Sequence, residues 1–524
     1  MGFSNIYALF RSRAAEFADR PAFYVRREGR WCPLTWREAE ETVMALACAF
    51  NSVGLTRGAS VAILAGNIPE WTICDLAAIA AGGVGVGIYP TSSAEQARYI
   101  IEHSDAEFVI VDTLAQLQKV PPVAKVKRVL CIEDGTFDAF LDEGRSRRAD
   151  LSAVVEAIGS SLKPDDTAIM VYTSGTTGEP KGAMLSHRYI LNSIDSLARS
   201  VPIFENDTSL SYLPGCHVAE RISGIYNRLN AGATAYFVDD ISRLYEYMHE
   251  VQPTVFASLP RFFEKIHASL IAGDKLSADD LRAALGGKVR LLTSGGAPLP
   301  EEIADFFEDR ALPILQAYGL TENICVAFNT AEHHRHGTVG RPMPGCEVRI
   351  AADGEIEIKS EMMFSGYYKE PIKTAEMFTG DGWLKTGDLG SIDADGFLRI
   401  TGRKKEMIIL SNGKNVAPAL VENLVKESHL ISHCFVHGDG HSYCVALITV
   451  NAAESAGLSP GEIEFAVAAA VERANARLSG PEQIKRFHIL PRDLDPVAEV
   501  TPTMKLKRAA VAAAYHDILE KLYE

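Results

Sequence analysis

The chain has 524 residues, of which 47% are hydrophobic and 23% charged, and it carries a formal net charge of −16 at pH 7. This length exceeds what one hydrophobic core usually holds, so it predicts two or more domains. The acidic balance argues against nucleic acid and against an anionic membrane surface as partners, because both require a concentrated basic face.

Nine cysteines are scattered along the chain without a Cys-x-x-Cys pair. The odd count indicates reduced thiols and predicts a cytoplasmic protein. The first residues lack the apolar core of a signal peptide, so export is not expected. The most apolar stretch, residues 76–89, contains four glycines and is too short to span a bilayer. We therefore expect no transmembrane segment, and peripheral membrane contact stays open.

Helical and strand-like patterns alternate over the first 160 residues. Such alternation predicts an α/β fold in which parallel sheets are covered by helices. We expect helices over residues 40–53, 69–81, 95–103 and 188–200, and strands over residues 60–65, 84–89, 107–112 and 167–172.

A loop rich in glycine and hydroxyl side chains follows the strand expected at 167–172. It contains three glycines, four hydroxyl residues and one lysine, Lys181, between Thr173 and Gly182. Glycines let successive N–H groups converge on an anion, and the helix expected next would favour negative charge at its start. This chemistry suits a polyphosphate, although a plain surface loop is the alternative. It is not a Walker A loop, because Lys181 follows Gly178 by three residues.

The loop resembles, residue for residue, the phosphate-binding signature of the adenylate-forming enzymes, which include acyl-CoA synthetases, adenylation domains and firefly-type luciferases. This resemblance implies a large N-terminal domain of helix-covered sheets and a small, mobile C-terminal α/β domain. The implied boundaries are residues 1–402 and 403–524, with a hinge at 402–406. The implied phosphate-binding residues are Thr173, Ser174, Gly175, Thr176, Thr177, Gly178 and Lys181.

Residues 213–221 resemble the Leu-Pro-x-x-His-x-x-Glu-Arg motif of long-chain acyl-CoA synthetases. The resemblance places His217 between the acyl and nucleotide pockets, while a structural histidine is the alternative. Residues 253–265 resemble another segment of that group, but only residues 266–290 separate them from the next motif, where a long insertion is usual. The length of the acyl chain is therefore left open.

The remaining nucleotide-site residues are assigned by the same resemblance. Thr321 would meet the α-phosphate and Glu322 would bind Mg²⁺, a hard cation that needs few protein carboxylates beside phosphate oxygens. Three nearby histidines, at 333, 334 and 336, lack the ligand spacing of a transition-metal site. The other implied contacts are Gly295, Gly296, Ala297, Pro298, Gln316, Tyr318 and Gly319 near the adenine, and Asp388 and Arg403 at the ribose.

Three further positions follow from the resemblance in the C-terminal region. Lys405 occupies the hinge position, and Gly413 lies in the segment brought to the site for thioester formation. Lys505 matches the catalytic lysine in a Lys-x-x-Arg pattern that ends at Arg508, although the usual preceding glycine is absent and Lys507 is a competitor.

Together these motifs imply a two-step ligation. A carboxylic acid, expected to be a medium- or long-chain fatty acid, attacks ATP to give acyl-AMP and pyrophosphate, and coenzyme A then displaces AMP. Charge compensation by Mg²⁺ and lysines would carry the first step. The alternatives are loading of a carrier-protein phosphopantetheine, a luciferase-like oxygenase reaction, and a P-loop hydrolase or kinase.

Overall fold

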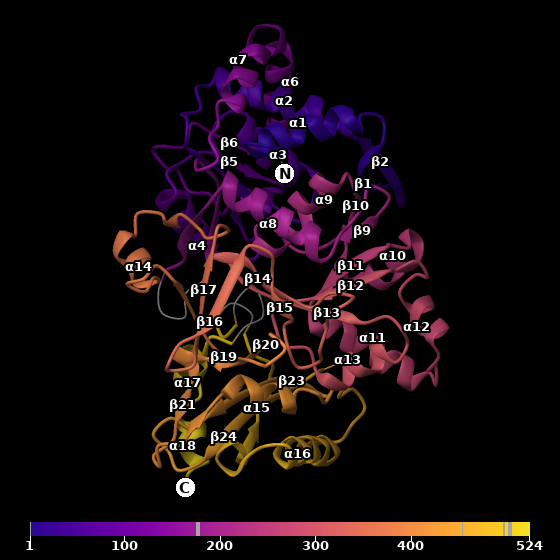
Figure 1. The fold of residues 1–524 in the computed structure, drawn as a ribbon, viewed down its shortest axis with the longest axis vertical. Helices are drawn as coiled ribbons and strands as arrows, with labels where there is room; N and C mark the ends of the chain where they lie inside the picture. The colour runs from indigo at the N-terminus through magenta and orange to yellow at the C-terminus, as the bar shows by residue number, and fades with distance from the viewer. Residues whose placement is uncertain (1, 174–178, 453, 496–497, 501–505) are drawn as a thin grey trace.

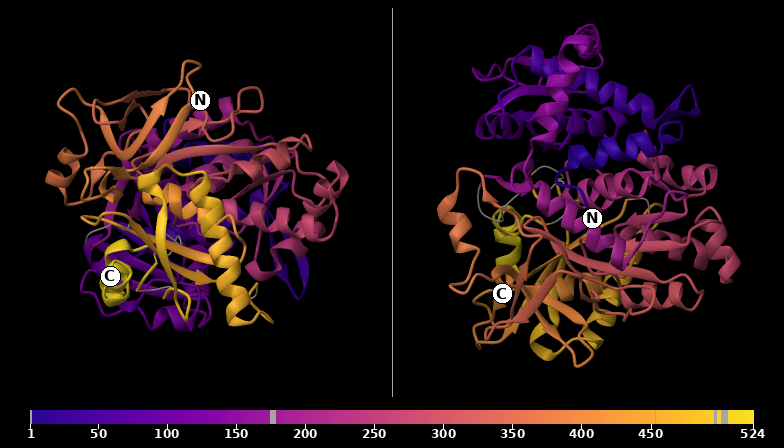
Figure 2. Two further views of the ribbon diagram at one scale, coloured as in Figure 1. Left: turned by 90° about the horizontal axis from the view of Figure 1, so that it is seen from below. Right: turned by 45° about the horizontal axis from the view of Figure 1, so that its top comes forward.

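The computed structural model describes residues 2–173, 179–452, 454–495, 498–500 and 506–524. The helix-rich N-terminal part lies at one end of the molecule and the C-terminal domain at the other (Figure 1). Seen from below, the C-terminal domain lies in front of the N-terminal domain (Figure 2, left). Among the described residues, no helix has the length and apolar character needed to cross a bilayer.

The central sheet of the N-terminal domain has the strand order β18-β8-β7-β4-β3-β5-β6. Strands β7, β4, β3, β5 and β6 are parallel, and β8 and β18 add an antiparallel edge. All residues of β3 and β4 are buried, as expected for strands covered on both faces. The strands are β3 (Ser60–Leu64), β4 (Val84–Ile88), β5 (Ala106–Val111), β6 (Arg128–Cys131), β7 (Thr167–Thr173), β8 (Lys181–Ser186) and β18 (Gly366–Tyr367).

Two further sheets of mixed direction continue the N-terminal domain, in the orders β2-β1-β10-β9 and β11-β12-β13-β14-β15. Their strands are β1 (Pro21–Arg27), β2 (Arg30–Thr35), β9 (Thr208–Ser211), β10 (Thr234–Phe237), β11 (Val255–Ser258), β12 (Leu291–Ser294), β13 (Ile314–Leu320), β14 (Asn323–Phe328) and β15 (Arg341–Pro342).

An antiparallel sheet of order β16-β17-β19-β20 lies between these sheets and the C-terminal domain (Figure 1). Its strands are β16 (Cys346–Ile350), β17 (Glu355–Ser360), β19 (Leu384–Ile392) and β20 (Leu398–Arg403).

Helices cover the sheets of the N-terminal domain, and α3 packs directly on β3 and β4. A π-helix, η1 (Ala219–Tyr226), precedes α9. The helices are α1 (Ile6–Glu16), α2 (Trp36–Ser52), α3 (Pro69–Ala80), α4 (Ala94–His103), α5 (Leu114–Leu117), α6 (Thr136–Ser146), α7 (Arg148–Ser160), α8 (His187–Ser200), α9 (Asn227–Ala231), α10 (Leu244–Val251), α11 (Pro260–Ala272), α12 (Ala278–Ala284), α13 (Glu301–Glu308) and α14 (Pro371–Glu376).

The C-terminal domain has its own apolar core, in which α15 and α16 pack with the sheet β23-β24-β25. A short hairpin, β21-β22, precedes that unit. The elements of the C-terminal domain are β21 (Ile408–Ile409), β22 (Asn415–Val416), α15 (Pro418–Val425), β23 (Ile431–His437), β24 (Cys444–Val450), α16 (Pro460–Ala476), β25 (Ile484–Ile489), α17 (Arg508–Ala514) and α18 (His516–Lys521). The predicted α/β class is confirmed.

The helix expected at residues 188–200 is confirmed as α8, but a strand that was not predicted lies between the glycine-rich loop and this helix. Strand β8 follows the loop and pairs antiparallel with β7, so the loop joins two strands of a hairpin. Helix α8 begins only at His187, capped by the Ser186 side chain. The N-terminus of α8 therefore lies one full strand beyond the loop, and the favourable field expected from it does not apply there.

Candidate active site

The residues on either side of the glycine-rich loop, at the end of β7 and the start of β8, pair with each other. Thr173 is the register partner of Lys181, and Tyr172 is the partner of Gly182. A Cβ atom at Gly182 would come within 3.0 Å of the Tyr172 ring, which explains the glycine. The predicted loop residues Ser174, Gly175, Thr176, Thr177 and Gly178 lie outside the described residues.

Thr321 and Glu322 form the tight turn between β13 and β14. Gly319 is required there, because a Cβ atom would lie 1.9 Å from the carbonyl oxygen of Ile324. The Tyr189 hydroxyl donates to the Thr321 carbonyl at 3.0 Å and accepts from the Ile324 N–H at 3.0 Å. The turn is thus held rigidly, with the Glu322 carboxylate buried.

The phenol of Tyr367 links this turn to the lysine of the hairpin. Its hydroxyl donates to Oε1 of Glu322, and the Lys181 ammonium lies 4.5 Å from the centre of its ring. Burial, and then the Glu322 charge, raise the pKa of Tyr367 well above its ordinary value, so the phenol is a donor at neutral pH. Sequence reasoning missed Tyr367, which stands in an ordinary Gly-Tyr-Tyr run.

The segment predicted to lie along the adenine follows β12 and is mostly exposed. Gly296 has φ of +80°, a left-handed conformation that favours glycine. The loop is tied to β13 because the Leu299 N–H donates to Oε1 of the buried Gln316 at 3.3 Å. The positions concerned are Gly295, Gly296, Ala297 and Pro298.

Asp388 is buried and contacted from two sides. Arg403 Nε lies 2.7 Å from its Oδ1 atom, and the Tyr318 hydroxyl donates to Oδ2. Asp388 and Arg403 are register partners on β19 and β20, while Tyr318 comes from β13. Burial, and then the Asp388 charge, raise the pKa of Tyr318 well above its ordinary value. Three residues predicted from separate motifs therefore meet at one carboxylate.

His217 lies between β9 and the π-helix η1, where its Nδ1 atom accepts the Ala219 N–H at 3.2 Å. A fully buried network is joined to this segment, because the Arg221 N–H donates to the His217 carbonyl at 2.9 Å. Arg221 pairs with Asp75 of α3, and the Tyr226 hydroxyl donates to the same carboxylate at 2.6 Å. π-Helical segments are rare in proteins, and those that occur are often found at functional sites. Asp75 gave no sequence signal because it stands inside an apolar helical pattern.

The hinge candidate Lys405 is exposed on a short 3-10 turn, Lys404–Glu406. Its neighbour Lys404 makes ion pairs of 2.6 and 2.7 Å with Asp353 and Glu355. Glu355 also accepts the N–H of Gly387, the residue before Asp388, at 2.9 Å. The residue before the hinge candidate is thus tied to the sheet that carries Asp388.

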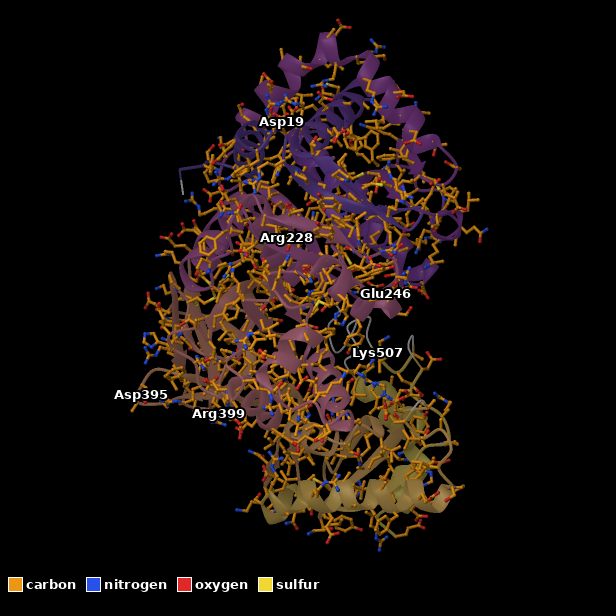
Figure 3. All side chains as sticks on the ribbon, turned by 90° about the vertical axis from the view of Figure 1, so that its right-hand side faces the viewer. Asp19, Arg228, Glu246, Asp395, Arg399 and Lys507 are labelled. Carbon is orange, nitrogen blue, oxygen red and sulfur yellow. The ribbon has the colours of Figure 1, made fainter. Side chains whose placement is uncertain are left out.

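The C-terminal domain presents a charged segment toward the N-terminal part. Arg508 donates to Glu422 at 2.6 Å, and Glu422 also accepts the Val436 N–H at 2.9 Å. Lys507 lies where the C-terminal segment faces the N-terminal part (Figure 3). Lys505 itself lies outside the described residues. Gly413, with φ of +75°, is exposed in the turn between β21 and β22.

The histidine run after β14 is engaged with acidic side chains of α13. His334 lies 2.7 Å from Glu308, and His336 contacts Asp305. In the described part of the chain, no group of three or more His, Cys, Asp or Glu side chains is arranged to hold a metal ion.

Comparison with known proteins decides the family. The profile of the AMP-binding enzymes matches residues 10–368, and that of the AMP-binding enzyme C-terminal domain matches residues 405–524. The chain belongs to the AMP-binding enzyme family. It is 35% identical to the long-chain-fatty-acid–CoA ligase FadD15 of Mycobacterium bovis, over 99% of this chain and 97% of the relative.

Two solved structures share the fold of this chain. ATP-bound MatB from Rhodopseudomonas palustris superposes with a TM-score of 0.77 at 23% identity, covering 98% of this chain and 99% of that one. The A-PCP didomain of carboxylic acid reductase from Segniliparus rugosus gives 0.81 at 22% identity, covering 100% of this chain and 82% of that one. These likenesses confirm a family fold with a large N-terminal and a C-terminal domain.

Proposed function

We propose that this AMP-binding enzyme converts a fatty acid, ATP and coenzyme A into acyl-CoA, AMP and pyrophosphate. The proposal rests on one observation. The buried carboxylate of Asp388 is contacted by both Tyr318 and Arg403, near the turn that bears Glu322. The substrate class rests on the relatives, because FadD15 of M. bovis is named a long-chain-fatty-acid–CoA ligase and aligns over nearly its whole length.

In the first step, a carboxylate oxygen bonds to the α-phosphorus of ATP while the bond to pyrophosphate breaks. An anion must approach a polyanion, so the protein has to neutralise charge and position both reactants. We assign this role to Lys181, the glycine-rich loop and Lys505, with Thr321 at the α-phosphate. Asp388 and Arg403 would orient the nucleotide through its ribose.

A magnesium ion fits the side chains present. Glu322 offers a buried carboxylate at a rigid turn, and Mg²⁺ commonly combines one or two such carboxylates with phosphate oxygens and water. When bound, the ion supplies charge neutralisation at the phosphates. Glu322 would hold it, and Lys181 would bind the phosphates independently.

In the second step, the thiol of coenzyme A attacks the acyl carbonyl, AMP leaves and the thiol proton passes to solvent. We propose domains 1–402 and 403–524 that rotate about residues 402–406 between the steps, removing Lys505 and bringing the Gly413 turn to the site. The anchored Lys404 beside the exposed Lys405 supports a pivot at this point. Domain rotation of this kind is a common gating device.

His217 would line the junction between the acyl and nucleotide pockets, and its main chain is held by Arg221, which pairs with Asp75. We also propose a cytoplasmic reaction, since the nine cysteines are free thiols. A carrier protein is the alternative acyl acceptor.

Pyrophosphate release with and without coenzyme A tests the function across a panel of saturated fatty acids and aromatic acids. The proposal predicts that release is selective for fatty acids and that turnover rises with coenzyme A. Release that depends on an aromatic acid, or turnover that depends only on a carrier protein, would contradict it. The panel also determines the preferred chain length.

A further inference from the structure

Tyr367 stands between two charged groups that belong to different parts of the nucleotide site. Its hydroxyl donates to Oε1 of Glu322, while the Nζ atom of Lys181 lies 4.5 Å from its ring centre. Tyr367 is 4% exposed and Glu322 is 8% exposed, so water competes little for the hydrogen bond between them. A cation over the face of a tyrosine ring is attracted by the ring quadrupole, more strongly where it is desolvated.

The main chain around Tyr367 fixes it to the same two elements. Strand β18 pairs with β8, and the Tyr368 N–H donates to the carbonyl of Gly182 at 2.8 Å. On the other side, the Phe364 N–H donates to the carbonyl of Glu322 at 2.8 Å. Residues 364–368 therefore connect the β7–β8 hairpin, which carries the glycine-rich loop, to the β13–β14 turn.

The position of the ring is fixed locally as well. The Tyr367 N–H donates to Oγ1 of Thr374 at 2.9 Å, and Gly366 has φ of +125°, where a Cβ atom would lie 2.8 Å from Thr374. Phe364 packs edge-on against the Tyr367 ring at 4.9 Å between centroids. The hydroxyl thus reaches Glu322 from a side chain that has little freedom to move.

We propose that Tyr367 is a positioning residue. It fixes the orientation of the metal-binding carboxylate, Glu322, and the position of the phosphate-binding ammonium, Lys181. By donating to Oε1, it directs Oε2 of Glu322 to the cation. The face of its ring attracts the Lys181 ammonium and so holds it at the start of β8, directly after the glycine-rich loop. This inference rests on the proposed function, because it assumes that Glu322 binds Mg²⁺ and that Lys181 binds phosphate.

Two substitutions separate the two contacts. Tyr367→Phe removes the hydroxyl and keeps the ring, whereas Tyr367→Leu removes both. Calorimetry of ATP binding, with Mg²⁺ and with EDTA, reads metal binding without catalysis. For Tyr367→Phe we expect the Mg²⁺ concentration for half-maximal effect to rise about tenfold, as for other partners of metal ligands, with ATP affinity in EDTA unchanged. For Tyr367→Leu we expect ATP affinity in EDTA to fall as well, roughly threefold.

Tyr368→Phe is the matched control. It also removes a phenol that donates to a carboxylate, but that carboxylate belongs to Asp105, whose Oδ2 atom lies 2.9 Å from the hydroxyl. We expect the Mg²⁺ titration of this variant to coincide with that of the wild-type enzyme. An equal shift in both tyrosine variants would overturn the inference, because it would reveal a general loss of packing.

A double-mutant cycle keeps the test decisive if either variant loses stability. If Tyr367 acts through Glu322, adding Tyr367→Phe to Glu322→Gln produces no further change in the Mg²⁺ titration. Additive shifts would contradict the inference. Its failure is distinguishable from failure of the proposed function, since wild-type pyrophosphate release tests the function alone.

Discussion

Arg403 Nε lies 2.7 Å from Oδ1 of Asp388, and these two residues face each other across neighbouring antiparallel strands. Tyr318 lies on a different sheet, and its hydroxyl donates a hydrogen bond to the other carboxylate oxygen of Asp388. Two residues beyond Arg403, the exposed Lys405 begins the connection to the C-terminal domain. The proposed ribose contact therefore ends strand β20, and the proposed hinge lies in the 3-10 turn that directly follows it.

Asp388→Asn is expected to weaken AMP binding by about tenfold or more, because an amide offers the ribose one acceptor fewer and leaves hydrogen-bonding groups unpaired. Calorimetric titration with AMP measures the loss. The control ligand is 2′,3′-dideoxy-AMP, which lacks both hydroxyls and should bind the variant and the wild-type enzyme equally. An equal loss for both ligands would assign Asp388 a structural role only.

Glu322→Gln is expected to raise the Mg²⁺ concentration needed for half-maximal pyrophosphate release, since a neutral amide is a poor ligand for a hard cation. The substitution keeps the side-chain volume and an acceptor for the Tyr367 hydroxyl, so thermal stability should change little. A metal titration that matches wild type would show that Glu322 is not a magnesium ligand.

Lys505→Ala is expected to abolish acyl-adenylate formation while ATP affinity stays within several-fold. A charge contact made chiefly in the transition state is worth about 3–4 kcal/mol, by analogy with lost oxyanion donors. Pyrophosphate release is the readout for the first step. Lys507→Ala is the paired control and should retain most activity. The reverse pattern, with Lys507 essential and Lys505 dispensable, would move the catalytic role by two residues.

Asp75→Asn is expected to lower the melting temperature strongly. It leaves the fully buried Arg221 guanidinium without its counter-charge, and breaking a buried pair in this way typically costs about 3–5 kcal/mol. Asp19→Asn is the contrasting control, since its pair with Arg37 is exposed and surface pairs contribute little. A melting temperature of Asp75→Asn equal to wild type would contradict the role of the Asp75–Arg221 pair in holding the His217 segment.

Lys405→Pro is expected to separate the two half-reactions. Proline fixes φ near −65° and removes an N–H, which restricts a residue that must change conformation. Pyrophosphate release should survive at least in part, whereas thioester formation from supplied acyl-adenylate and coenzyme A should fall by orders of magnitude. Lys405→Gly controls for the lost charge and should support both steps. Equal loss of both steps in the proline variant, or of neither, would refute the hinge.

Sequence reasoning captured elements whose patterns are local. The helix expected at 69–81 is α3 (Pro69–Ala80), and the strand expected at 107–112 is β5 (Ala106–Val111). It failed where the next element was a strand of mixed polarity: β8 carries Lys181, Gly182 and Ser186, and only its pairing with β7 reveals it.

The candidate site divides in the same way. The carboxylates and cations stand in recognisable motifs, so Glu322, Asp388 and Arg403 could be named from the sequence. Their partners could not, because Tyr367 and Asp75 act through contacts between segments far apart in the chain. A tyrosine beside a glycine, or an aspartate inside an apolar helix, carries no local signal of such a role.

The most direct test of the central claim follows the oxygen atoms of the substrate. With a fatty acid labelled with ¹⁸O at both carboxylate oxygens, ATP and coenzyme A, attack on the α-phosphorus leaves one labelled oxygen in AMP and the other in the thioester. We predict one ¹⁸O atom per AMP formed, by mass spectrometry. Unlabelled AMP, or label found instead in phosphate together with ADP, would contradict acyl-adenylate formation.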